Sequence, residues 1–213
     1  WEERVGEHTY SSAAVYGDIR AGVEIAGLLG EKGEFTGRWR LAADSLKIAV
    51  ERKLWKPEWG RFLRSTRTKL NPWGSEHTSD KTVIQVNPKG YKRDVTLEDG
   101  TVDVSLLGTA IPFGMFDVSD CKVAATAETI ERVLTAHPAG GIKRYENDGY
   151  IGGNPWVIAT LWVALYHIRT GNFKKALPYF EWSVKARTEV GLLPEQVDRD
   201  TGKPAWVIPL TWS

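Results

Sequence analysis

The sequence predicts an all-α fold with one small β-hairpin excursion near residues 60–100. Apolar residues recur at helical spacing over six stretches, and glycine, proline or a capping residue stands at most of their ends. β-branched and aromatic residues between the second and third stretches, with turn signals at 87–90 and 99–100, predict the hairpin. The 213 residues are 42% hydrophobic and 26% charged, an ordinary globular composition that can bury one sizeable core. We therefore expect a single domain over residues 1–213.

The helices are expected where apolar periodicity and end signals agree. Thr36 can cap the second helix, and Asn154, followed by Pro155, can cap the fifth. A seventh helix is expected to begin near Pro209. The six preceding stretches are residues 9–29, 36–56, 102–110, 123–136, 154–169 and 173–190.

The loop lengths indicate where function is concentrated. Connections after the second, fourth and sixth helices are long, at residues 57–101, 137–153 and 191–208, whereas the others are short. Because consecutive antiparallel helices put alternate loops at opposite ends, the three long loops and the segment before the first helix are expected at one end. Long loops on a rigid scaffold commonly carry binding and catalytic residues.

Several function classes lack their signature in this sequence. It has no phosphate loop, dinucleotide fingerprint, serine-hydrolase elbow or zinc-protease helix, and its four histidines have no metal-ligand spacing. We therefore expect no metal and no organic cofactor. The formal charge of +1 argues against a general polyanion binder, so the basic segment at 61–93 is interpreted as a solvated surface. No apolar run reaches the ~18–20 residues of a membrane helix. Neither nucleic acid nor a membrane is an expected partner.

The long-loop end is rich in aromatic, acidic and amide side chains. Flat aromatic rings offer apolar faces to sugar rings, while carboxylates, arginine and amides hydrogen-bond to hydroxyl groups. Two carboxylates across one pocket are the minimum for glycoside hydrolysis. The alternative is that these are core tryptophans and surface glutamates. The residues are Trp1, Glu2, Glu3, Arg144, Tyr145, Asp148, Tyr150, Asn154, Trp156, Glu195, Gln196, Trp206 and Trp212.

Three stretches in this set resemble a known family. They are Trp-Glu-Glu-Arg at 1–4, the Arg-Tyr…Asp…Gly-Asn-Pro-Trp loop at 144–156, and Leu-Pro-Glu-Gln at 193–196 followed by Pro-Leu-Thr-Trp-Ser at 209–213. In this order they resemble the glucoamylase family, glycoside hydrolase family 15, and its bacterial members more than its fungal ones. The helix start at 103–107 is also similar to that family.

The resemblance implies roles for particular residues. Glu2 would be the general acid and Glu195 the general base of an inverting, exo-acting hydrolase. Such an enzyme releases β-D-glucose from the non-reducing ends of an α-linked gluco-oligosaccharide or a starch-like substrate, a reaction of polysaccharide degradation. The implied substrate-binding residues are Trp1, Glu3, Arg144, Tyr150, Trp156 and Trp212.

The resemblance also implies a fold, an (α/α)6 toroid of which this chain would hold about helices six to twelve. We therefore expect an incomplete C-terminal portion of the catalytic domain, with the N-terminal half of the domain missing. A non-catalytic carbohydrate-binding or structural helical fragment stays open, and so does a phosphorylase-like relative. The sequence does not distinguish among α-1,4, α-1,6 and α,α-1,1 linkages.

Overall fold

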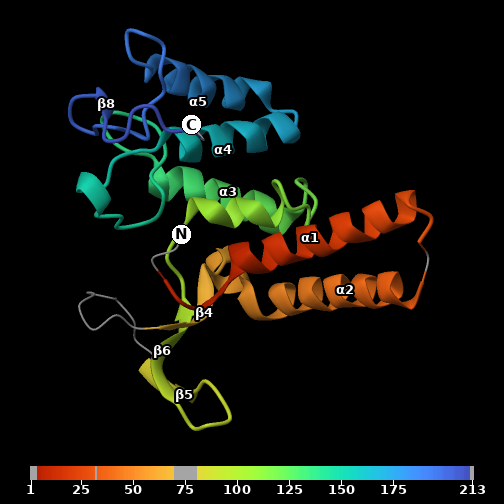
Figure 1. The fold of residues 1–213 in the computed structure, drawn as a ribbon. Helices are drawn as coiled ribbons and strands as arrows, with labels where there is room; N and C mark the ends of the chain where they lie inside the picture. The colour runs from red at the N-terminus through yellow and green to blue at the C-terminus, as the bar shows by residue number, and fades with distance from the viewer. Residues whose placement is uncertain (1–3, 32, 70–80, 212–213) are drawn as a thin grey trace. The chain divides into compact units, whose positions relative to one another are not determined.

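A computed structural model describes residues 4–31, 33–69 and 81–211. The chain forms two compact units, residues 1–101 and 102–213, which are coloured along the chain in Figure 1. Helices predominate in both units, but each unit also contains small sheets. The all-α prediction is therefore confirmed only in part. No helix in the described ranges is both long and apolar enough to cross a membrane.

The first unit contains a helical hairpin. Helices α1 (Thr9–Leu28) and α2 (Glu34–Leu54) lie side by side in Figure 1, close to the predicted ranges. Thr36, the predicted cap, lies inside α2, where its hydroxyl donates to the Gly33 carbonyl at 2.8 Å. The helix begins at Glu34 because Gly33 itself takes the extended backbone of the cap position.

The β excursion of the first unit is larger than a hairpin. Its four antiparallel strands follow the order β1-β4-β6-β5, and the turn predicted at 87–90 joins β5 to β6. A separate pair, β2 with β3, surrounds the short 3-10 helix η1. The bounds are β1 Glu7–His8, β2 Trp55–Lys56, η1 Pro57–Trp59, β3 Arg61–Phe62, β4 Ser65–Lys69, β5 Lys81–Gln85 and β6 Lys92–Asp99.

A buried ion pair joins Arg64, the residue before β4, to Asp99 at the end of β6. Arg64 Nε donates to Asp99 Oδ2 at 2.9 Å, and the backbone N–H of Arg64 donates to the Asp99 carbonyl at 2.9 Å. Burial alone would raise the pKa of Asp99, but the charge and hydrogen bonds of Arg64 outweigh burial and lower it. The carboxylate is therefore held in its charged form inside the unit.

The second unit is built mainly from three helices that lie side by side in Figure 1. Short 3-10 helices precede α3 and α4, and a two-stranded ladder follows α5. The elements are η2 Val104–Thr109, α3 Cys121–Leu134, η3 Tyr150–Gly152, α4 Val157–Arg169, α5 Phe173–Lys185, β7 Gln196–Val197 and β8 Pro204–Ala205.

Three predicted helix ends in the second unit are wrong. Asn154 does not cap the fifth helix, because α4 begins at Val157 with Trp156 at the cap position, and the Asn154 side chain bonds elsewhere. The sixth helix ends at Lys185 instead of continuing to residue 190. Residues 206–211 form bends and a turn, so no helix begins at Pro209 within the described chain.

One polar cluster ties the three helices together. The carboxylate of Glu131 on α3 pairs with His167 Nε2 on α4 at 2.9 Å and accepts from the Tyr179 hydroxyl on α5 at 2.9 Å. The imidazole and phenol rings stack at 6.0 Å between centroids. Burial, assisted by the Glu131 charge, raises the pKa of Tyr179. The buried His167 is therefore held between the helices by its contact with Glu131.

Candidate active site

The loop between α3 and α4 is closed by its own backbone. The Trp156 N–H donates to the Ile142 carbonyl at 2.9 Å and so closes the part of the loop from residue 142 to residue 156. Gly153 lies where the chain turns back, with φ +72°, and a Cβ there would come 2.3 Å from the Asp148 carbonyl oxygen. Only glycine fits this approach, which explains one glycine of the Gly-Gly-Asn-Pro-Trp stretch.

Arg144 and Asp148 form a buried ion pair inside this loop. Arg144 Nε and Nη2 donate to Asp148 Oδ2 and Oδ1 at 2.7 and 2.8 Å. The two side chains are 6% and 0% exposed, and Asp148 Oδ1 also accepts from the Tyr150 N–H at 3.0 Å. Because a bidentate pair is directional as well as strong, Asp148 fixes the guanidinium in one orientation.

Aromatic rings surround this guanidinium. Its Cζ lies 4.6 Å from the ring centroid of Trp156 and 4.9 Å from that of Tyr150. A cation over the face of an aromatic ring is attracted by the ring quadrupole. The structure thus brings together three residues predicted from the sequence to bind substrate, Arg144, Tyr150 and Trp156.

Glu195, the predicted base, is buried and held through its neighbour in the chain. Its Oε2 accepts from Gln196 Nε2 at 2.9 Å, and only 8% of the residue is exposed. Gln196 Oε1 in turn accepts from Asn154 Nδ2 at 3.2 Å, while Asn154 Oδ1 accepts from the Arg199 N–H at 3.2 Å. This relay of hydrogen bonds joins the carboxylate of Glu195 to the loop that carries Arg144.

The backbone holds Glu195 against the same loop. Trp156 and Gln196 form a bridge, and the Val157 N–H donates to the Glu195 carbonyl at 3.2 Å. On the other side the Glu195 N–H donates to the Val207 carbonyl at 2.8 Å, next to the ladder of β7 and β8. The two long loops of this unit therefore meet at one place, as their lengths predicted.

The turn that joins β7 to β8 is closed by a single carboxylate. Asp198 Oδ1 accepts from the Thr201 N–H and hydroxyl, both at 2.7 Å, and from the Asp200 N–H at 3.1 Å. These bonds lower the pKa of Asp198, the Thr201 hydroxyl contributing most. Over the described ranges, no group of three or more histidine, cysteine or acidic side chains could hold a metal ion.

Four predicted site residues, Trp1, Glu2, Glu3 and Trp212, lie outside the described residues. The segment directly after the first three is anchored within the first unit. The Lys69 N–H donates to the Val5 carbonyl at 2.7 Å, and the Thr9 N–H donates to the Arg64 carbonyl at 3.0 Å. A Cβ on Gly6 would approach the Thr68 Cα to 3.1 Å, so this segment runs close against β4.

The model of the family described as glycosyl hydrolases family 15 matches residues 1–213. The chain belongs to this family.

Similar proteins agree with this assignment. An uncharacterized glycosyl hydrolase from Methanocaldococcus jannaschii is 30% identical over 226 residues, which cover 100% of this chain and 32% of that protein. An isomaltose glucohydrolase from Kribbella flavida is 28% identical over 128 residues, covering 55% of this chain and 33% of that protein. This family 15 chain thus spans about a third of the length of the curated relatives it matches.

The fold agrees with the family as well. A bacterial glucoamylase in complex with acarbose superposes with a TM-score of 0.74 at 23% identity, covering 99% of this chain and 32% of that one. The helices of this family 15 chain are therefore similar to the glucoamylase (α/α)6 fold. At this identity the superposition is evidence for the fold alone.

The sequence did not indicate which side chains would hold Arg144 and Glu195 in place in this family 15 chain. Asp148 and Gln196 are candidate site residues by composition, but their pairing with Arg144 and Glu195 comes from the folded loops. The Arg-Tyr-Glu-Asn-Asp spacing, with arginine and aspartate four residues apart, is the one local signal that could have indicated the ion pair. Asn154 has no such signal, because its partners are 42 and 45 residues away.

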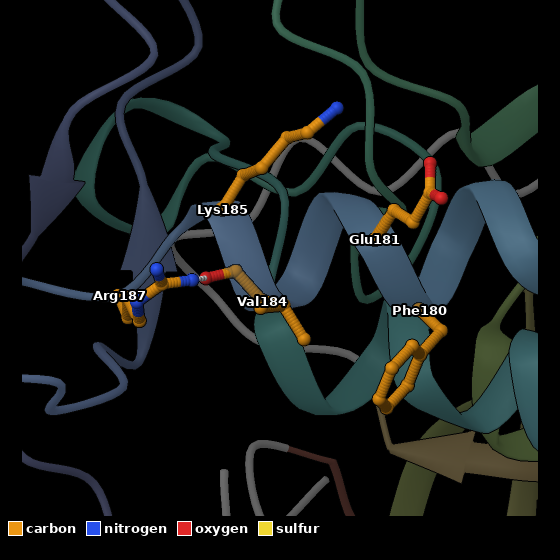
Figure 2. A pocket seen from close by; sticks show the side chains of 5 residues that line it. All are labelled: Phe180, Glu181, Val184, Lys185 and Arg187. Atoms are coloured by element: carbon orange, nitrogen blue, oxygen red, sulfur yellow. Dashed lines mark hydrogen bonds between the residues drawn. The ribbon is translucent and has the colours of Figure 1, made fainter.

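A groove on α5 is separate from these predicted residues. Figure 2 shows Glu181 and Lys185 on one side of the helix and Phe180 and Val184 on the other, with Arg187 donating to the Val184 carbonyl. Its volume is about 340 Å³. None of its lining side chains was predicted to bind substrate, and the adjacent acid and base on one helix face have the spacing of a solvated surface pair.

Proposed function

We propose that this chain supplies part of the catalytic site of an inverting, exo-acting α-glucoside hydrolase that releases β-D-glucose from non-reducing ends. The observation that carries the proposal is the environment of Glu195: a buried carboxylate, oriented by Gln196, in the same unit as the guanidinium and aromatic rings of Arg144, Tyr150 and Trp156. A sugar needs both kinds of contact, apolar faces for its ring and directional donors for its hydroxyl groups.

In this proposal Glu195 is the general base. Its carboxylate removes a proton from a water molecule, which attacks the anomeric carbon from the face opposite the leaving oxygen. Glu2 is the general acid and donates a proton to that oxygen as the glycosidic bond breaks. Inversion requires the two carboxyl groups to be ~6.5–9.5 Å apart, leaving room for the water. Glu3, Trp1 and Trp212 complete the proposed substrate contacts.

Two further parts of the proposal concern the rest of the protein. The chain spans 49% of a solved glycosidase that it superposes on with a TM-score of 0.73. We propose that N-terminal helices outside these 213 residues complete the toroid and the glucose site. The substrate is proposed to be an α-linked gluco-oligosaccharide, and both α-1,4 and α-1,6 linkages belong in the test because the relatives include a glucoamylase and an isomaltose glucohydrolase.

The test is proton NMR of maltotriose and isomaltose incubated with two proteins: these 213 residues alone, and the full-length protein that contains them. Early signal from the β-anomer of glucose is expected from the full-length protein. Glu195→Gln should remove this signal while acarbose binding persists. Glu131→Gln is the matched control, because that carboxylate bonds only helix side chains among its described contacts, and turnover should persist.

Three results would contradict the proposal. Early NMR signal from α-glucose would indicate that the anomeric configuration is retained. Unchanged turnover in Glu195→Gln would remove the base assignment. Sugar binding without hydrolysis by the full-length protein would favour the alternative, a non-catalytic carbohydrate-binding fragment.

A further inference from the structure

Trp206 has an unusual backbone and an unusual exposure. Its φ is +64°, in the left-handed region that bulky side chains rarely adopt. Its side chain nevertheless does not gain burial from this conformation, since the residue is 54% exposed. A strained backbone that presents a large apolar ring to solvent is not explained by packing, and such outliers concentrate at functional sites.

The backbone ties Trp206 to the predicted base. Its neighbours on both sides pair with the strand of Glu195: Gln196 pairs with Ala205, and the Glu195 N–H donates to the Val207 carbonyl at 2.8 Å. Trp206 therefore lies between two residues that contact the Glu195–Gln196 segment.

The side chain of Trp206 is oriented by Tyr150. Its Nε1 donates to the Tyr150 hydroxyl at 3.0 Å, and the two rings meet edge to face with centroids 6.2 Å apart. Tyr150 lies 6.2 Å from Trp156 in turn. The three rings form a continuous aromatic row that starts on the guanidinium of Arg144 and ends at Trp206.

Exposure rises along this aromatic row. Trp156 is 5% exposed, Tyr150 41% and Trp206 54%. An exo-acting site holds the terminal sugar at its closed end, so the second sugar ring extends toward solvent. The buried end of the row, at Arg144 and Trp156, suits the terminal ring. The exposed end suits the ring on the leaving-group side of the bond that breaks.

We propose that Trp206 determines specificity by contacting the leaving-group sugar ring and by holding Tyr150 against that ring. This inference rests on the proposed function. It predicts that Trp206 matters for substrates with a second ring and not for substrates without one. Maltose and α-D-glucosyl fluoride form that pair, since fluoride leaves without a sugar attached.

The experiment compares the kcat/KM of the full-length protein and its variants on both substrates. Trp206→Ala should lower the value for maltose by about 3- to 10-fold, the loss expected from one aromatic contact, and change the value for glucosyl fluoride by less than about 2-fold. Trp206→Phe should lower the kcat/KM for maltose less than Trp206→Ala does. Tyr150→Phe, which removes the hydroxyl that accepts from Trp206, should also lower it, but by less than Trp206→Ala. Trp39→Phe, at a tryptophan 43% exposed on α2, is the control and should change neither value.

A binding measurement separates this inference from the proposed function. The dissociation constants of maltose and glucose are measured by titration calorimetry in the Glu195→Gln background, with and without Trp206→Ala. Weaker maltose binding with unchanged glucose binding supports the inference even if no protein hydrolyses either substrate, an outcome that would remove the proposed function alone. Equal effects on the two sugars, equal effects on the two kcat/KM values, or no effect would each overturn the role of Trp206.

Discussion

Replacing Asp148 by alanine should strongly destabilise the second unit. The change leaves the Arg144 guanidinium, whose side chain is 6% exposed, without the carboxylate that receives two of its hydrogen bonds. It also removes the acceptor of the Tyr150 N–H. Losing one partner of a buried ion pair costs about 3–5 kcal/mol of unfolding free energy, because the remaining charge stays removed from water after its counter-charge is lost.

That magnitude is large against the whole stability of a domain. The unfolding free energy of native proteins is about 5–15 kcal/mol, so Asp148→Ala should remove roughly a fifth of it or more. If the unfolding free energy falls by about 2 kcal/mol per molar urea, the urea midpoint of unfolding should fall by roughly 1.5–2.5 M. Tryptophan fluorescence is a suitable readout because the Trp156 ring centroid lies 4.6 Å from the Arg144 Cζ.

The same unit provides the control. Arg199 and Asp200 approach to 3.9 Å at the surface, where their side chains are 53% and 79% exposed. Asp200→Ala should cost less than about 1 kcal/mol, the usual upper range of an exposed pair. Equal small shifts for Asp148→Ala and Asp200→Ala would refute the reasoning. So would a double variant, Arg144→Met with Asp148→Leu, that is no more stable than Asp148→Ala alone, because removing both charges should relieve the penalty.

Three further predictions concern other contacts. Gly141→Ala should destabilise the protein by more than about 1 kcal/mol in urea unfolding, because φ is +73° and a Cβ would lie 2.4 Å from the Trp182 ring. Gly27→Ala is the control: a Cβ there would have nothing within 4 Å, and the change should stabilise α1 by about 0.5–1 kcal/mol. Gln196→Leu removes the bond that orients the proposed base, so kcat for maltose should fall about 2- to 12-fold with little change in KM. Asp99→Asn should reduce the loss of unfolding free energy at acid pH. The pKa of Asp99 is lowered in the folded protein, so the unfolded chain binds more protons at acid pH. The stability that this carboxylate contributes is therefore present above about pH 4 and is lost as the pH falls below that value.

Each of these has an outcome that contradicts it. Gly141→Ala with an unchanged midpoint would mean that Trp182 moves aside without cost. A rise in KM at constant kcat for Gln196→Leu would assign that residue to substrate binding. Parallel urea midpoints of the parent and Asp99→Asn between pH 6 and pH 3 would mean that the charge of Asp99 contributes nothing to folding.

Helix positions could be predicted from the sequence because their signals are local. Apolar periodicity over 9–29 and 173–190 reflects burial on one face, and α1 and α5 occupy those stretches, although α5 ends early. Strand β1 is two residues long and pairs with Ser65 and Thr66, far along the chain, so no local pattern indicates it. Loop length, together with the alternation of antiparallel helices, predicted that the two long loops of the second unit meet.

The contacts of the candidate site could be predicted less well. Asn154 before Pro155 has the local signature of a helix cap, yet its amide bonds Gln196 and the Arg199 backbone, because those partners arrive with the second loop. Local chemistry and tertiary contacts compete for the same polar side chain, and here the tertiary contacts prevail. Trp206 illustrates the same limit, since its positive φ has no signal in residue type.

The hairpin of β7 and β8 has a consequence for how this protein could change over generations. Glu195 directly precedes β7 and Trp206 directly follows β8, and Asp198 closes the turn between the strands by accepting from Asp200 and Thr201. A lineage could therefore acquire a new substrate preference by replacing one contiguous stretch of about a dozen codons, while the helices beneath stay untouched. The same compactness limits adaptation, because an insertion in this stretch would affect Glu195, the proposed base, and Trp206 together.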